Sequence, residues 1–307
     1  MSLTSFINKK EIRQRFVEVF PLPKINYDAE LKAPPLTKNY SLVGTAFDYL
    51  LRFYIERNNS NAKTTEWVAK NALRKPMMKT SFERIKKEYE QKKKIGKTNN
   101  VERFFRYLYI CYMKTEQMFY DAKERHKIYL ENGTITDKLL ESTLHLATLD
   151  QMFRSGRWIH VMVDYEPEKL EKIDLVEEDD IKDLRKLIEL VNIDLFNSEN
   201  ICLLNPTFGD ASLLVGGADA DLIIDNRIIE IKTTKYFTLK REYLNQLIGY
   251  YILNLLSGDS KSNINNLSIY FSRYGRFFTI KLPFESVSKD KFDEFVKWFK
   301  KEAEKIR

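Results

Sequence analysis

The sequence predicts an α/β protein in which a sheet-containing core carries a helical lobe. Short β-branched runs separated by turn residues concentrate in residues 196–307, whereas residues 58–195 carry apolar residues at helical spacing and little strand pattern. Residues 1–57 read as an irregular arm followed by a first core helix. With 43% hydrophobic and 31% charged residues, the composition is that of a folded globular protein, and we expect one domain over residues 1–307.

Composition also limits the function classes. The net charge of +7 suits a polyanionic partner without requiring one. Cys111 and Cys202 are too few for a four-cysteine iron–sulfur cluster, so we expect no such cluster, and the three histidines are scattered. No apolar run reaches the length of a membrane span, so we expect a cytoplasmic protein with no membrane partner.

The first predicted core helix begins near Ser41. Its apolar residues recur at helical spacing and give a wide buried face, in which Asp48 is the one polar residue that stands out. Arg52 follows Asp48 by one turn and is placed to pair with it or to approach a phosphate.

The lobe is expected to contain several helices. Apolar spacing predicts helices over Val101–Leu130, over Thr136–Ser155 with Thr136 as N-cap, and over Asp179–Val191. The basic run Lys86–Lys94 is either a solvated helix face or a surface that follows a phosphate backbone.

Strands and helices alternate through the core. Ala211–Ile224 is expected to lead into a β-hairpin, and the last helix is amphipathic through Phe292, Phe295 and Phe299. The other expected elements are a strand over Ile201–Asn205, a helix over Leu239–Leu256 and strands over Leu267–Ser272 and Phe277–Leu282.

The hairpin brings two carboxylates together. The β-branched runs Leu222–Ile224 and Ile228–Ile231 flank Asp225-Asn226, a pair that suits the positive-φ turn of a hairpin. With a two-residue loop, Ile224 pairs with Arg227, Ile223 with Ile228 and Leu222 with Ile229. Asp221 then falls opposite Glu230, about 5 Å away between Cβ atoms.

One face of this hairpin is predicted to bind a metal. Side-chain alternation puts Asp219, Asp221, Glu230 and Lys232 on the same face. Like charges opposite each other destabilise a sheet unless a cation lies between them, and carboxylates favour Mg²⁺ or Mn²⁺. The alternative is a solvated hairpin whose polar face meets only water and in which Lys232 neutralises a neighbouring carboxylate. The register favours Asp221 as the ligand and Asp219 as a partner of Lys232, whereas a shifted turn would exchange them.

These residues carry a resemblance. Asp221, then Glu230-Ile231-Lys232, then Gln246-Leu-Ile-Gly-Tyr250 resemble the motifs of the PD-(D/E)XK nuclease superfamily, and the Gln-x-x-x-Tyr element resembles its RecB-like branch. The resemblance implies a restriction-endonuclease-like αβββαβ core with a large helical insertion. It also implies a Mg²⁺- or Mn²⁺-dependent nuclease that hydrolyses DNA in defence, repair or recombination.

The same resemblance implies roles for individual residues. Asp221 and Glu230 would bind the metal together with the carbonyl of Ile231, and Lys232 would attend the attacking water. Gln246 and Tyr250 would fix the lysine, the water or a phosphate. In the family the first core helix often carries Gly-Thr-x-x-His, whereas here Gly44-Thr45 is followed by Asp48, which is either a further acidic group near the metal or a helix-start aspartate.

Two other functions stay open at this point. One is a catalytically inactive nucleic-acid-binding protein, and the other is a protein-interaction module on the same fold. The sequence does not decide between single- and double-stranded DNA, between DNA and RNA, between endonuclease and exonuclease, or which oligomeric state is formed.

Overall fold

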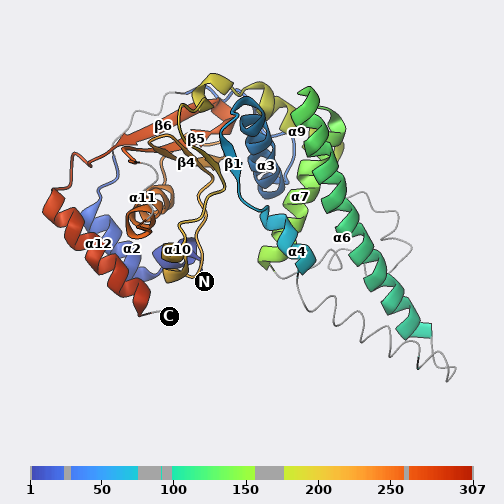
Figure 1. Ribbon diagram of the computed structural model, residues 1–307, viewed down its shortest axis with the longest axis horizontal. Coiled ribbons are helices and arrows are strands. Elements are labelled where there is room, and N and C mark those ends of the chain that lie inside the picture. Colours follow the sequence, from blue (N-terminus) through green and yellow to red (C-terminus); the bar gives the residue numbers. More distant parts are fainter. Residues whose placement is uncertain are drawn as a thin grey trace. The chain divides into compact units, whose positions relative to one another are not determined.

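The protein has an α/β architecture built on a six-stranded mixed sheet (Figure 1). A computed structural model describes residues 2–23, 29–74, 91, 99–155, 176–258 and 263–305. The basic run Lys86–Lys94 lies outside these described residues except for Gln91.

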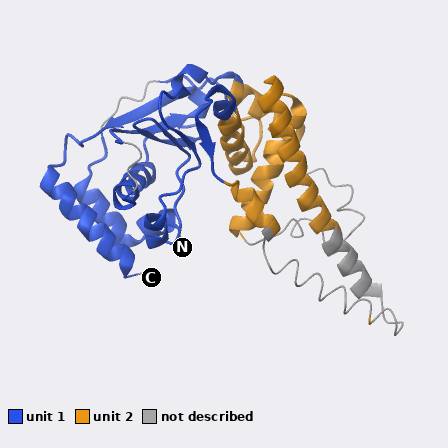
Figure 2. Ribbon diagram, in the orientation of Figure 1, with its two compact units in different colours: residues 1–34, 54–65, 189–307 blue, residues 35–53, 66–188 orange. Residues whose placement is uncertain are grey.

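The chain divides into two compact units (Figure 2). Unit 1 comprises Met1–Pro34, Tyr54–Thr65 and Glu189–Arg307, and unit 2 comprises Pro35–Phe53 and Glu66–Ile188. The division falls within helix α3 (Tyr40–Asn58). Unit 1 contains the whole sheet, and the regular elements described in unit 2 are helices.

The strands of unit 1 lie side by side in sequence order. They are β1 (Ala62–Thr64), β2 (Cys202–Leu204), β3 (Leu222–Ile224), β4 (Arg227–Lys232), β5 (Asn266–Phe271) and β6 (Arg276–Lys281). β2, β3 and β4 form an antiparallel meander, and β6 is antiparallel to β5. β5 is parallel to β4, and this pairing is reached through the crossover helix α11 (Arg241–Leu256).

Helices of unit 1 pack around α11 (Figure 1). α11 contacts β4 and β5 of the sheet and also the short helices α1 (Leu3–Ile7) and α10 (Asp210–Leu214). α2 (Lys10–Val19) packs against α12 (Lys289–Glu304), with the rings of Phe16 and Phe295 4.9 Å apart. One buried apolar cluster therefore joins both ends of the chain to the sheet; it includes Phe16, Ile228, Leu247 and Phe295.

Unit 2 is built around two helices that pack on each other, α6 (Asn99–Asn132) and α7 (Asp137–Ser155). The predicted N-cap of α7 is confirmed, because the Leu139 N–H donates a 3.2 Å hydrogen bond to Thr136 Oγ1. Tyr49 of α3 donates its hydroxyl to Asp150 of α7 at 3.3 Å. The remaining elements are η1 (Val68–Lys70), α4 (Asn71–Arg74) and α9 (Glu178–Glu189) in unit 2, and η3 (Ile193–Phe196) and η4 (Ser272–Tyr274) in unit 1.

Two segments differ from the expectation. The short strand β1 was not predicted, since Ala62-Lys63-Thr64 has no apolar alternation and forms its strand by pairing with β2. The segment Ala211–Ile224, expected to lead into the hairpin, begins with the helix α10, which was not predicted. Ser212 Oγ accepts from the Phe208 N–H at 2.8 Å and donates to the Ala218 carbonyl at 2.9 Å, which closes a turn that Gly216 and Gly217 complete at positive φ.

The other expected elements of the core are present in the predicted order: strand, hairpin, helix, strand, strand, helix. Within the part of the chain that the structure describes, no helix is both long enough and apolar enough to cross a membrane.

Candidate active site

The hairpin of β3 and β4 has the predicted register. Ile224 pairs with Arg227, Ile223 with Ile228, and Leu222 with Ile229. Asp225 adopts a left-handed φ of 49° in the turn, as a two-residue hairpin loop requires. Its carboxylate also accepts backbone hydrogen bonds of 2.8 and 2.9 Å from Asn200 and Ile201, so the turn is fixed to the chain that enters β2.

At the other end of the hairpin, Asp221 turns its side chain toward β4. The ladder ends at Leu222, and the Asp221 carbonyl accepts a 2.8 Å hydrogen bond from the Asn205 N–H. The carboxylate accepts a 2.6 Å hydrogen bond from the backbone N–H of Ile231. Asp221 is thereby held against the strand that carries Glu230 and Lys232.

Glu230 and Lys232 form an ion pair on the α11 side of β4. The Lys232 ammonium lies 2.5 Å from Glu230 Oε1, and Glu230 is only 3% exposed. Burial lowers the pKa of the Lys232 ammonium, but the negative charges of Glu230 and Asp221 raise it by more, so its net pKa is above the ordinary value. The lysine therefore holds its proton in this arrangement. The polar face is covered in part by α11, which packs on β4, whereas the Glu230–Lys232 pair is the neutralisation that the alternative interpretation also expects.

Two side chains of α11 continue the polar contacts from Lys232. Gln246 Oε1 accepts from Lys232 at 3.3 Å, and Gln246 Nε2 donates to the Tyr250 hydroxyl at 2.8 Å. They lie one turn apart on the helix, as their spacing predicts. Four side chains from β4 and α11 thus form one hydrogen-bonded run: Glu230, Lys232, Gln246 and Tyr250.

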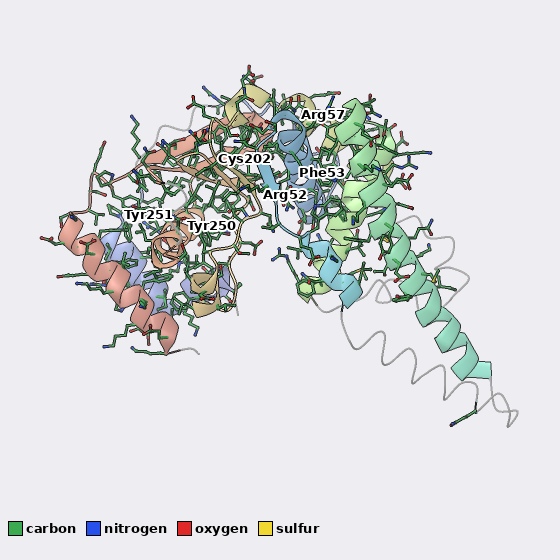
Figure 3. All side chains as sticks on the ribbon, in the orientation of Figure 1. Arg52, Phe53, Arg57, Cys202, Tyr250 and Tyr251 are labelled. Atoms are coloured by element: carbon green, nitrogen blue, oxygen red, sulfur yellow. The ribbon has the colours of Figure 1, made fainter. Side chains whose placement is uncertain are left out.

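Tyr250 ends this run and is buried; Figure 3 labels its position. Its ring stacks on Phe208 with the ring centroids 5.7 Å apart. Burial, reinforced by the charges of Glu230 and Asp221, raises the pKa of its hydroxyl well above the ordinary value. The hydroxyl is therefore neutral over the physiological range and acts as a hydrogen-bonding group.

Tyr243 belongs to the same site although we did not select it from the sequence. The Lys232 ammonium lies over its ring, 4.9 Å from the centroid, which is within the range of a cation–π contact. Its helical spacing could have identified it from the sequence, because Tyr243 precedes Gln246 by three residues and therefore lies on the same face of α11. Lys232 is thus contacted by a carboxylate, an amide and an aromatic ring.

The two other acidic candidates have different surroundings. Asp219 forms an isolated antiparallel bridge with Thr207, and its charge also contributes to the raised pKa of Tyr250. Asp48 belongs to unit 2, where its carboxylate accepts a 2.6 Å hydrogen bond from Arg52, as its spacing predicts. All other predicted site residues belong to unit 1.

The donor set suits a hard divalent cation held mainly by oxygen. Asp221 and Glu230 offer carboxylates, and both charges act on Lys232 and on Tyr250. Among the described residues, no group of three or more histidine, cysteine, aspartate or glutamate side chains is arranged to hold a metal ion. Mg²⁺ is commonly held by one or two carboxylates and several waters, so two carboxylates and the Ile231 carbonyl fit it.

Comparisons of the chain with models of protein families, with curated proteins and with solved structures each found no match.

Proposed function

We propose that this protein is a Mg²⁺- or Mn²⁺-dependent nuclease of the PD-(D/E)XK type, with a RecB-like Gln-x-x-x-Tyr helix, that hydrolyses phosphodiester bonds of DNA. The topology of unit 1 supports a restriction-endonuclease-like core. An antiparallel meander of β2, β3 and β4 is followed by α11 and then by β5, which is parallel to β4. With α3 before them, and with the edge strand β1 left aside as an addition, these elements have the order αβββαβ.

One observation carries the proposal. The motif residues are separated by up to 29 positions in the chain, from Asp221 to Tyr250. They are nevertheless linked: Glu230 and Gln246 contact Lys232, Tyr250 contacts Gln246, and Asp221 is bonded to the strand that carries Lys232. In a solvated hairpin the side chain of Lys232 would be exposed to water, and Gln246 would not be expected to form a hydrogen bond with it. Ionisable groups with perturbed pKa values that gather around one point are typical of functional sites.

The chain's own residues have separable tasks in such a reaction. A bound Mg²⁺ or Mn²⁺ would activate water and offset the negative charge that develops on the phosphate. Asp221 and Glu230 would hold it, with the Ile231 carbonyl. Lys232 would offer a positive charge and N–H donors to a phosphate oxygen or to the attacking water. Gln246 and Tyr243 orient that ammonium, and Tyr250 orients Gln246.

Incubation of the purified protein with DNA tests the proposal. Linear duplex, circular duplex and single-stranded DNA are each incubated with Mn²⁺, with Mg²⁺ or with EDTA, and the products are separated on denaturing gels. We expect cleavage that depends on the metal and that Glu230→Gln abolishes. Binding without cleavage in every metal would instead favour an inactive nucleic-acid-binding protein. Cleavage that survives in Glu230→Gln would remove the proposed site.

A further inference from the structure

The segment that joins β4 to α11 has an unusual composition for a short connection. Residues 233–240 contain two basic residues, Lys235 and Lys240, and no acidic one. The connection also carries the neighbouring aromatic residues Tyr236 and Phe237. Positive charge interleaved with aromatic rings suits a polyanion that also has flat apolar groups.

Contacts on both sides of Tyr236 fix this segment. The Phe237 ring lies 4.7 Å from the ring of Phe271 and 5.0 Å from that of Tyr274, between centroids. The Tyr274 hydroxyl donates a 2.6 Å hydrogen bond to the Lys235 carbonyl. Leu239 is buried in the core of unit 1. The backbone around Tyr236 is therefore anchored to β5 and to the turn that follows it.

Tyr236 nevertheless points outward from this anchored segment. It is 56% exposed, and its N–H donates to Thr234 Oγ1 at 3.2 Å. The ammonium of Lys235 lies over its ring, 5.2 Å from the centroid. The ring of the next residue, Phe237, packs inward on Phe271. Apolar surface is therefore present beside this segment, yet the ring of Tyr236 does not pack on it.

We propose that Tyr236 and Lys235 form a platform for single-stranded DNA, in which the tyrosine ring stacks on one unpaired base and the lysine binds an adjacent phosphate. A base inside a duplex is already stacked and paired, so only an unpaired base can use an outward-facing ring. The inference names single-stranded DNA as the substrate class of the proposed nuclease. Where the strand is cut relative to the stacked base rests on that proposed function. The stacking itself requires no cleavage.

The distance along the chain sets how far the platform lies from the site. Tyr236 follows Lys232 by four residues, which span at most about 14 Å. This distance joins Cα atoms, and both side chains extend beyond it, so the base on Tyr236 would lie a few nucleotides from the phosphate that Lys232 contacts.

Binding is measured in EDTA, by the fluorescence anisotropy of labelled oligothymidine about twelve nucleotides long and of a duplex of equal length. We expect the wild type to prefer the single strand. Tyr236→Ala should weaken single-strand binding about five- to a hundredfold, and Tyr236→Phe should retain it because the ring remains. Lys235→Ala should reduce the slope of log binding constant against log salt concentration by the amount expected for the loss of about one phosphate contact.

Tyr120→Ala is the matched control, because Tyr120 on α6 is 58% exposed and lies outside the segment. It should bind the single strand as the wild type does. The inference is wrong if the wild type binds no single strand or prefers the duplex, or if Tyr236→Ala binds as tightly as the wild type. A Tyr236 effect in a protein that cuts nothing would remove the proposed nuclease function but keep the platform.

Discussion

The backbone N–H of Ile231 donates a 2.6 Å hydrogen bond to the carboxylate of Asp221. This bond joins the residue before β3 to β4 just beyond the last pair of the ladder, Leu222 and Ile229. It therefore places the Asp221 carboxylate beside the strand that carries Glu230. Asp219, two residues earlier, makes its backbone bridge with Thr207 instead.

A metal-binding test follows for the two aspartates. Titration of the wild type with Mn²⁺ should raise its thermal midpoint, because a ligand that binds only the folded state stabilises it by mass action. Asp221→Asn should reduce this rise more than Asp219→Asn, since Asp221 is the one held beside β4. Differential scanning fluorimetry measures both. The reverse order would assign the metal to Asp219.

The Glu230 and Lys232 pair should be strongly coupled in stability. Lys232→Met removes the ammonium from a carboxylate that is 3% exposed, and we expect a loss of about 3 kcal/mol in the free energy of unfolding. Adding Glu230→Gln to this variant should restore part of the loss, because the buried negative charge is then removed as well. Urea unfolding in EDTA measures the double-mutant cycle. Additive losses would mean that the two charges do not act on each other.

The helix side chains of the site should affect the rate more than the fold. Gln246→Ala removes the contact with Lys232, and Tyr250→Phe removes the hydroxyl that Gln246 contacts. Each should lower the cleavage rate at least about tenfold, which corresponds to about 1.4 kcal/mol on the barrier. Rates are compared per folded molecule, with melting curves as the control. Earlier unfolding with a normal rate would make both residues part of the packing only.

Tyr243 should act on Lys232 through its ring. Tyr243→Phe keeps the face over which the ammonium lies and should keep the cleavage rate, whereas Tyr243→Leu should lower kcat about threefold or more with little change in KM. Acylation of Lys232, quantified by mass spectrometry, should rise in Tyr243→Leu and stay low in Tyr243→Phe. Equal behaviour of the two variants in both measurements would remove Tyr243 from the site.

Cys202 on β2 should be unreactive in the folded protein (Figure 3). Burial raises the pKa of its thiol to about 11, although a hydrogen bond with Ser198 acts in the opposite direction. Because the pKa is raised, the reactive thiolate appears only as the pH approaches 11, and at pH 8 about one thiol in a thousand is ionised. Alkylation mapped by mass spectrometry should modify Cys202 at pH 8 only after unfolding. Rapid modification of the folded protein would contradict the packing of β2.

Elements with strong local patterns were predictable. The β-branched runs on either side of Asp225-Asn226 gave the hairpin and its register, since a positive-φ turn of two residues leaves only one pairing. β1 and α10 were not predictable in this way. β1 depends on its partner β2, and α10 depends on the hydrogen bonds of Ser212 across a turn.

The sequence alone determined which side chains share a face. Strand alternation puts Glu230 and Lys232 on one side of β4, and a spacing of four puts Gln246 and Tyr250 on one side of a helix, because both periods are properties of the local backbone. Only the tertiary structure decided that these two faces meet, that Glu230 is buried there and that the ring of Tyr243 lies under the lysine. Local geometry does not specify which helix covers which face of a sheet, since that choice depends on the apolar surface that the whole unit buries.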